Sequence, residues 1–118
     1  MGYFRNHAIV VSDYDDKRIE RAQAAALVCF AKYGLDGLVS NVVKHAINGG
    51  AAFFISPDGS KEGWGYSEKG NKARAEFISW IKSDGGFLEW AEIILGGDDG
   101  EYKIEQSPNG SEPYSSVY

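Results

Sequence analysis

Short runs of apolar residues alternate along this chain with longer stretches in which apolar residues recur at helical spacing. The runs, each with the length of a strand, are residues 7–11, 38–44, 51–56 and 90–95. The first run is apolar on both faces, which predicts a central strand covered at least partly on each side. Residues 101–106 instead alternate, with Tyr102 and Ile104 on one face, which predicts a half-exposed edge strand.

Two helices are expected between these strands. The first covers residues 15–33, with Ser12 or Asp13 able to cap its start and Gly34 able to end it. Its apolar stripe consists of Ile19, Ala22, Ala26, Cys29, Phe30 and Tyr33. The second helix covers residues 68–83, with Ser67 as the expected N-cap.

The resulting order, βαββαββ, predicts an α+β domain. Two helices packed on one face of a mainly antiparallel sheet would bury both apolar stripes. Right-handed crossovers then give a ferredoxin-like sandwich with an additional edge strand. Residues 1–107 are expected to form this single domain, and residues 108–118, rich in Pro, Gly, Ser and Asn, to form a flexible C-terminal tail.

Composition adds constraints on location. Cys29 is the only cysteine in 118 residues, so no internal disulfide forms and a reducing interior is expected. The N-terminus lacks the pattern of a signal peptide, and no apolar run reaches the length that spans a membrane. These features predict a cytoplasmic protein with no membrane partner.

Charge is distributed unevenly along the chain. The net charge is −5, which disfavours direct nucleic-acid binding through phosphate contacts. Residues 84–118 hold eight acidic residues and one basic residue, Lys103, so this third of the chain carries −7. Such a segment is either a solvated surface or a contact surface for a basic partner.

No constellation of catalytic or metal-binding residues stands out. His7 and His45 are 38 residues apart and lack a motif, and they are interpreted as a strand and a turn histidine. Asp13, Asp15 and Asp16 are better explained by helix capping than by a calcium loop, because the twelfth position of such a loop is not a glutamate. We therefore expect a non-enzymatic protein with no cofactor and no metal.

Two segments are predicted to contact a partner. Trp64 and Tyr66 lie in a glycine-containing loop, where large aromatic residues suit an interface. The hairpin around residues 98–102 is acidic and leads into the predicted edge strand, which offers charge complementarity and backbone pairing. The predicted contacts are Trp64, Tyr66, Asp98, Asp99, Glu101 and Tyr102.

The order of these features resembles that of small phage-encoded anti-defence proteins. The resemblance is to type II-C anti-CRISPR proteins, which bind the nuclease domain of Cas9. It rests on the first strand ending near Ser12, on residues 52–55, 76–82 and 90–93, and on their order. The resemblance implies a viral inhibitor that acts in the host cytoplasm by binding a host protein, such as a nuclease that handles nucleic acid.

Two alternatives remain open. The first is an oligomer, for instance a homodimer formed through the uncovered sheet face, that sequesters a nucleotide signal with Lys61, Lys69 or Arg74 as phosphate partners. The second is a small metal-dependent enzyme of the nuclease kind. It ranks last because no paired, buried acid–base set is visible in the sequence.

Overall fold

The computed structural model describes residues 4, 6–97 and 100–108 of the chain, and the Glu101 side chain is outside that description. The strands are β1 (His7–Asp13), β2 (Val43–Lys44), β3 (Ala51–Ile55), β4 (Glu89–Gly96) and β5 (Glu101–Gln106). The helices are α1 (Asp16–Ala31), α2 (Gly65–Asp84) and a short 3-10 turn, η1 (Asp36–Leu38).

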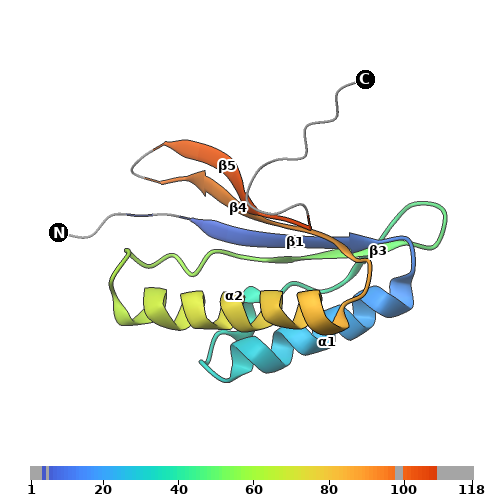
Figure 1. Ribbon diagram of the computed structural model, residues 1–118, viewed down its shortest axis with the longest axis horizontal. Coiled ribbons are helices and arrows are strands. Elements are labelled where there is room, and N and C mark those ends of the chain that lie inside the picture. Colours follow the sequence, from blue (N-terminus) through green and yellow to red (C-terminus); the bar gives the residue numbers. More distant parts are fainter. Residues whose placement is uncertain (1–3, 5, 98–99, 109–118) are drawn as a thin grey trace.

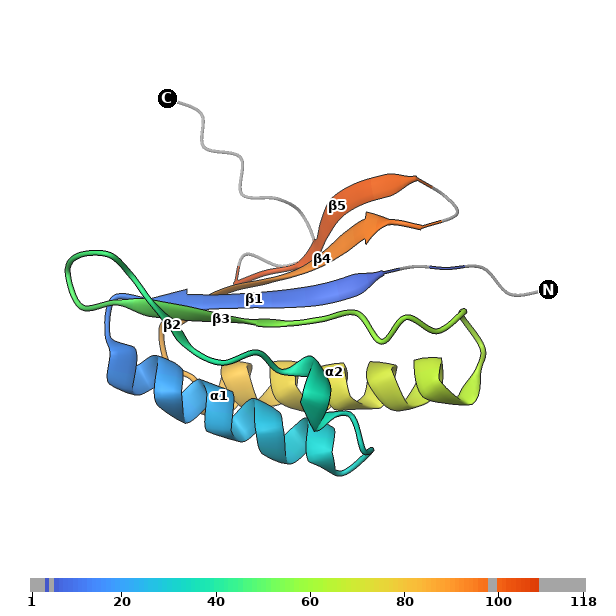
Figure 2. The same ribbon diagram turned by 180° about the vertical axis from the view of Figure 1, so that it is seen from behind.

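The strands form one five-stranded sheet in the order β2-β3-β1-β4-β5, and every neighbouring pair is antiparallel. Both long helices lie on the same side of this sheet (Figure 1, Figure 2). The predicted α+β class, with a mainly antiparallel sheet and two helices on one face, is confirmed. On the other side of the sheet, here called the open face, no helix of the described residues lies against the strands.

The hydrophobic core fills the space between the sheet and the two helices. Phe77 of α2 lies at its centre, with its ring 6.1 Å from that of Phe53 on β3 and 6.0 Å from that of Trp80. The largest fully buried side chains are Phe30, Phe77, Ile9, Ile19, Ile55, Ile94 and Val11. Ile19 and Phe30 belong to the predicted stripe of α1, so helical spacing located this part of the core correctly.

The predicted capping residues of α1 need correction. Neither Ser12 nor Asp13 caps the helix, because β1 extends to Asp13. Asp15 is the N-cap, and its carboxylate accepts a hydrogen bond from the Lys17 amide at 2.9 Å. At the other end of the helix, Gly34 has a φ of 73° and the Leu35 amide donates a hydrogen bond to the Phe30 carbonyl. This is the predicted helix end, in which a glycine adopts the left-handed conformation.

The start of α2 also differs from the prediction. The helix begins at Gly65, three residues earlier than expected, and Trp64 is its N-cap without a side-chain hydrogen bond. Ser67 lies inside the first turn and is buried, with its hydroxyl 3.4 Å from a Glu62 carboxylate oxygen. The predicted N-cap was wrong because Ser67 bonds to the preceding loop instead of to the helix.

The second predicted strand is mostly irregular. Only Val43 and Lys44 form β2, and the Ser40 hydroxyl replaces a backbone acceptor by taking a hydrogen bond from the Phe54 amide. The following hairpin agrees with its Asn-Gly signal, because Asn48 and Gly49 both adopt positive φ values, of 68° and 74°.

Candidate functional site: the open face of the sheet

The open face is built from the outward-pointing residues of all five strands. Residues that are directly opposite in the register share a face, so each cross-strand row can be followed. The central row is Phe54 on β3, Val10 on β1 and Ala91 on β4. On one side of it lies the row of Val43, Ala52, Ser12 and Glu89. On the other side lies the row of Ala8, Ile93 and Ile104, and beyond it the pair of Leu95 and Tyr102.

Most side chains of these rows are apolar, and several of them are exposed, although Ala8 is fully buried. Val10 and Phe54 are each 39% exposed, and Leu95 is 40% exposed. Glu89, at one end, is the only charged side chain in the rows given above. Outward positions of an antiparallel sheet are normally polar where water covers them. Contiguous apolar surfaces are typical of interaction sites in proteins.

The predicted contacts at the start of α2 lie away from the open face. Trp64 and Tyr66 are both exposed, and they belong to the helix layer on the other side of the sheet (Figure 1). The ammonium of Lys61 lies 5.5 Å from the Trp64 ring centroid, and that of Lys69 lies 5.3 Å from the Tyr66 ring centroid. These cation–π contacts hold both rings at the surface, where they are available to a partner.

The predicted contacts in the β4–β5 hairpin are described only in part. Tyr102 is 77% exposed and pairs with Leu95 on the open face, so it belongs to the apolar surface defined above. Asp98 and Asp99 lie outside the described residues, as does the Glu101 side chain. Of the six predicted contacts, Tyr102 is therefore the one that the structure places on the open face.

A buried polar cluster joins β4, β1 and α2 on the helix side of the sheet. The Arg74 guanidinium lies 3.1 Å from an Asp58 carboxylate oxygen and 3.8 Å from a Glu92 oxygen. His7 lies between two acids, 3.5 Å from Glu92 and 3.6 Å from Glu62. This cluster fixes the loop that precedes α2 to the sheet, because each ion pair crosses from one element to another.

Glu92 is the carboxylate on which the cluster converges. Burial by itself would raise the pKa of the Glu92 carboxyl, but His7, the Gln106 amide and the Arg74 charge outweigh it and keep the pKa below its usual value of 4.5. Gln106 donates to Glu92 at 2.8 Å. Glu92 is therefore held as an anion whose role is to bind its neighbours.

Two sequence-based interpretations change because of this cluster. Arg74, considered as a phosphate partner, is 3% exposed and committed to Asp58 and Glu92, so that assignment was wrong. Sequence reasoning also missed Glu92 as a buried acid, although it occupies an inward position of β4 between Trp90 and Ile94. A carboxylate at a core position of an alternating strand is the signal that would have found it.

A serine–histidine pair lies at the end of the sheet near the β2–β3 hairpin. The Ser12 hydroxyl is 3.3 Å from Nε2 of His45. The neighbouring acid, Asp13, accepts a hydrogen bond from the Asp15 amide and lies 3.8 Å from Arg18, so it is engaged away from His45. No carboxylate among the described residues hydrogen-bonds the imidazole, so within them the pair lacks the arrangement that activates a serine.

The described part of the chain contains no group of three His, Cys, Asp or Glu side chains placed to hold a metal ion. Within the same residues, neither long helix has the length and hydrophobicity needed to cross a membrane.

Comparisons with known proteins give no relative for this chain. No family model, no curated protein and no solved structure matches it. The open face must therefore be interpreted from its own geometry.

Proposed function

We propose that this chain is a non-enzymatic binding domain that docks a partner protein on the open face of its sheet. The observation that carries the proposal is the central row of Phe54, Val10 and Ala91, which is apolar, uncharged and without a covering helix. Burying such a surface contributes about 25 cal/mol for each square ångström removed from water. An interface centred on it would have the apolar core and polar rim found in protein complexes.

The charge pattern favours a different protein over a second copy as the partner. The chain carries −5, and residues 84–118, which include β4 and β5, carry −7. Two copies would each bring a net charge of −5 and repel each other, whereas a basic partner would be attracted. The expected partner therefore has an apolar patch surrounded by Lys and Arg.

A more specific role follows if that partner is a host defence protein. In that case the chain is a phage inhibitor that acts in the host cytoplasm, and a nuclease that handles nucleic acid offers a basic surface that suits the net negative charge of the chain. Adding the purified chain to a DNA-cleavage reaction of the type II-C nuclease tests this role. Inhibition at stoichiometric amounts supports it, and undiminished cleavage rejects this particular target.

The fold is part of the same proposal. We propose that the sheet is the ferredoxin-like arrangement, with β5 as the additional edge strand. The support is the order β2-β3-β1-β4, in which each long helix connects two strands that are separated in the sheet by one other strand.

The alternative function is an oligomer that sequesters a nucleotide. The uncharged central row would also suit a symmetric dimer, since Val10 and Phe54 bring no like charges together. This alternative loses support because Arg74 is not free to bind phosphate. Light scattering at micromolar concentration separates the two functions, because the alternative requires a stable oligomer in the absence of any other protein.

The contact surface is tested by binding measurements on three sets of variants. The first set places a charge on the open face (Val10→Glu, Phe54→Glu). The second removes the aromatic residues at the start of α2 (Trp64→Ala, Tyr66→Ala). The third reverses the charges of the β4–β5 hairpin (Asp98→Lys, Asp99→Lys, Glu101→Lys). The proposal expects the first set to abolish binding and the third to slow association. If only the second set weakens binding, the interface is the start of α2 and the proposed surface is wrong.

A further inference from the structure

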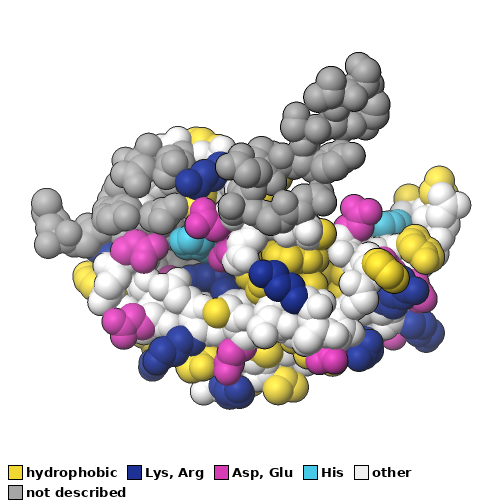
Figure 3. All heavy atoms as spheres, in the orientation of Figure 1, with side chains coloured by type: hydrophobic (Ala, Val, Ile, Leu, Met, Phe, Trp, Pro, Cys, Tyr) yellow, Lys and Arg dark blue, Asp and Glu magenta, His cyan; other side chains and the backbone are white. Residues whose placement is uncertain are grey.

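A hollow lies where β5 separates from β4. The register of this strand pair shifts between Glu92 and Ile93, and Gln106 is the last residue of β5. A bulge of this kind increases the twist of the strand pair. The space between the end of β5 and the last turns of α2 is left as a hollow of about 690 Å³. Figure 3 shows it as an apolar depression crossed by a basic side chain.

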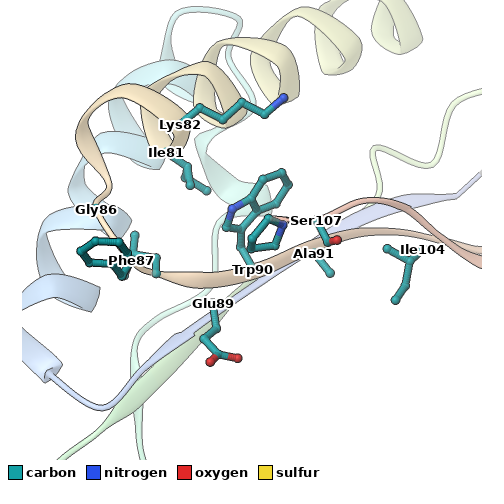
Figure 4. Close-up of a pocket in the computed structure, with 11 residues that line it drawn as sticks. Ile81, Lys82, Gly86, Phe87, Glu89, Trp90, Ala91, Ile104 and Ser107 are labelled. Atoms are coloured by element: carbon teal, nitrogen blue, oxygen red, sulfur yellow. The ribbon is translucent and has the colours of Figure 1, made fainter. Parts of the chain in front are cut away.

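The walls of the hollow are mainly apolar. Ile81, Leu88 and Trp90 are buried core residues that form its floor, and Ile104 and Pro108 line the side toward β5. The Trp90 indole stands at the centre of the hollow (Figure 4). Ligand pockets in proteins commonly have volumes of about 300–1,000 Å³ with apolar and aromatic walls. The hollow therefore has the size and lining of a small-molecule site.

Lys82 gives the hollow a positive charge. It lies in the last turn of α2, and its side chain runs across the hollow on the helix side of Trp90 (Figure 4). No ion pair within the described residues involves its ammonium. Glu89, the acidic residue of the lining, points away from Trp90 on the opposite side (Figure 4). Among the described residues, the hollow thus combines one cation that has no ion pair with a floor that includes the Trp90 indole.

We propose that this hollow is a binding site for an amphipathic organic anion. The apolar body of the ligand packs against Trp90, Leu88 and Ile104, and its acidic group pairs with Lys82. Because the site combines one cation with an apolar cavity, it favours a monoanion with a flat or aliphatic body. A polar, highly charged ligand such as a nucleoside triphosphate would bind less well. The hollow shares Ile104 with the edge of the open face, whereas its floor of Ile81, Leu88 and Trp90 belongs to the helix side of the sheet.

The test compares two fluorescent probes of similar shape. The probe 8-anilinonaphthalene-1-sulfonate is an aromatic monoanion, and N-phenyl-1-naphthylamine has the same body without the charge. Lys82→Met should weaken binding of the anionic probe about threefold to tenfold, because it removes one charge-assisted contact at a half-open site. Binding of the neutral probe should stay unchanged. Lys72→Met, which removes an exposed charge from the same helix, is the matched control.

Nuclear magnetic resonance shows where the probe binds. The Trp90→Phe variant identifies the indole N–H signal of Trp90, because that signal is missing from its spectrum. The Trp90 signal should shift during titration with the anionic probe, while the signals of Trp64 and Trp80 stay in place. The proposal is overturned if the shifts occur at Val10 and Phe54 instead, if the Lys82 and Lys72 variants behave alike, or if no saturable binding is observed.

Discussion

Val10 on β1 and Phe54 on β3 lie directly opposite each other, and both point away from the helices. Their sequence neighbours, Val11 and Phe53, form another opposite pair on the buried side. One strand pair therefore carries two layers of hydrophobic side chains, of which the helices cover only one. The uncovered layer is the reason for proposing that a partner binds there.

The two adjacent phenylalanines provide a test of this division. Phe53→Ala should lower the free energy of unfolding by about 3–5 kcal/mol, because Phe53 is 2% exposed and its removal leaves a cavity. Phe54→Ala should lower it by only about 1 kcal/mol, because Phe54 is already 39% exposed. Urea denaturation measures both values. Equal losses would mean that the open face is covered in the free protein.

Arg74 should contribute strongly to the stability of the fold. Arg74→Met removes the partner of two buried carboxylates, on Asp58 and Glu92, and should lower the free energy of unfolding by about 3–5 kcal/mol. The control is Lys32→Met, which breaks the exposed pair with Glu76 and should leave stability nearly unchanged. Chemical denaturation compares the two variants, and a stable Arg74→Met protein would contradict the account of the cluster.

Gly70 should resist a substitution that usually stabilises helices. Alanine is preferred over glycine by about 1 kcal/mol inside a helix. A methyl group at Gly70, however, would clash with the Asp58 carboxylate, which Arg74 holds in place. Gly70→Ala should therefore be destabilising, whereas Gly65→Ala, where the methyl group meets open space, should be neutral or stabilising. Thermal denaturation of both variants tests the sign, and a more stable Gly70→Ala protein would refute the packing described.

Glu92 should make the free energy of unfolding depend on pH. Its pKa is lower in the folded protein than the usual 4.5, so the folded state favours the anion. The resulting stabilisation is complete above the unfolded-state pKa and is lost as the pH falls through the folded-state value. In urea unfolding followed from neutral pH to about pH 3, Glu92→Gln should show a shallower acid dependence than the unmodified chain. Parallel curves would mean that Glu92 is not the responsible group.

Local patterns predicted most of the elements. Alternation at Tyr102 and Ile104 identified β5 with its correct bounds, and Asn48-Gly49 identified the β2–β3 hairpin. The predicted strand at residues 38–44 is regular only at Val43 and Lys44. At Ser40 the amide still donates to the Phe54 carbonyl, but the Ser40 hydroxyl takes the place of its carbonyl as the acceptor for the Phe54 amide. A hydrogen bond between residues so far apart in sequence is invisible to a periodic pattern.

The candidate site was harder to predict, because it depends on where the helices pack. The sequence predicted an uncovered sheet face, but apolar residues on both sides of β1 left open which of them form it. The three-dimensional arrangement shows that no helix of the described residues covers the face with Val10. The ion pairs of Arg74 likewise require that α2 lie against β4, which sequence spacing alone does not reveal.

Native mass spectrometry of the chain, purified gently from a bacterial host, tests the central proposal most directly. The comparison is between the unmodified chain, Phe54→Glu on the open face, and Val28→Glu, which charges an exposed apolar position of α1. The account predicts a bound partner protein on the unmodified chain and on Val28→Glu, and a bare monomer for Phe54→Glu. A partner that remains bound to Phe54→Glu, or an unmodified chain that carries none, would contradict it.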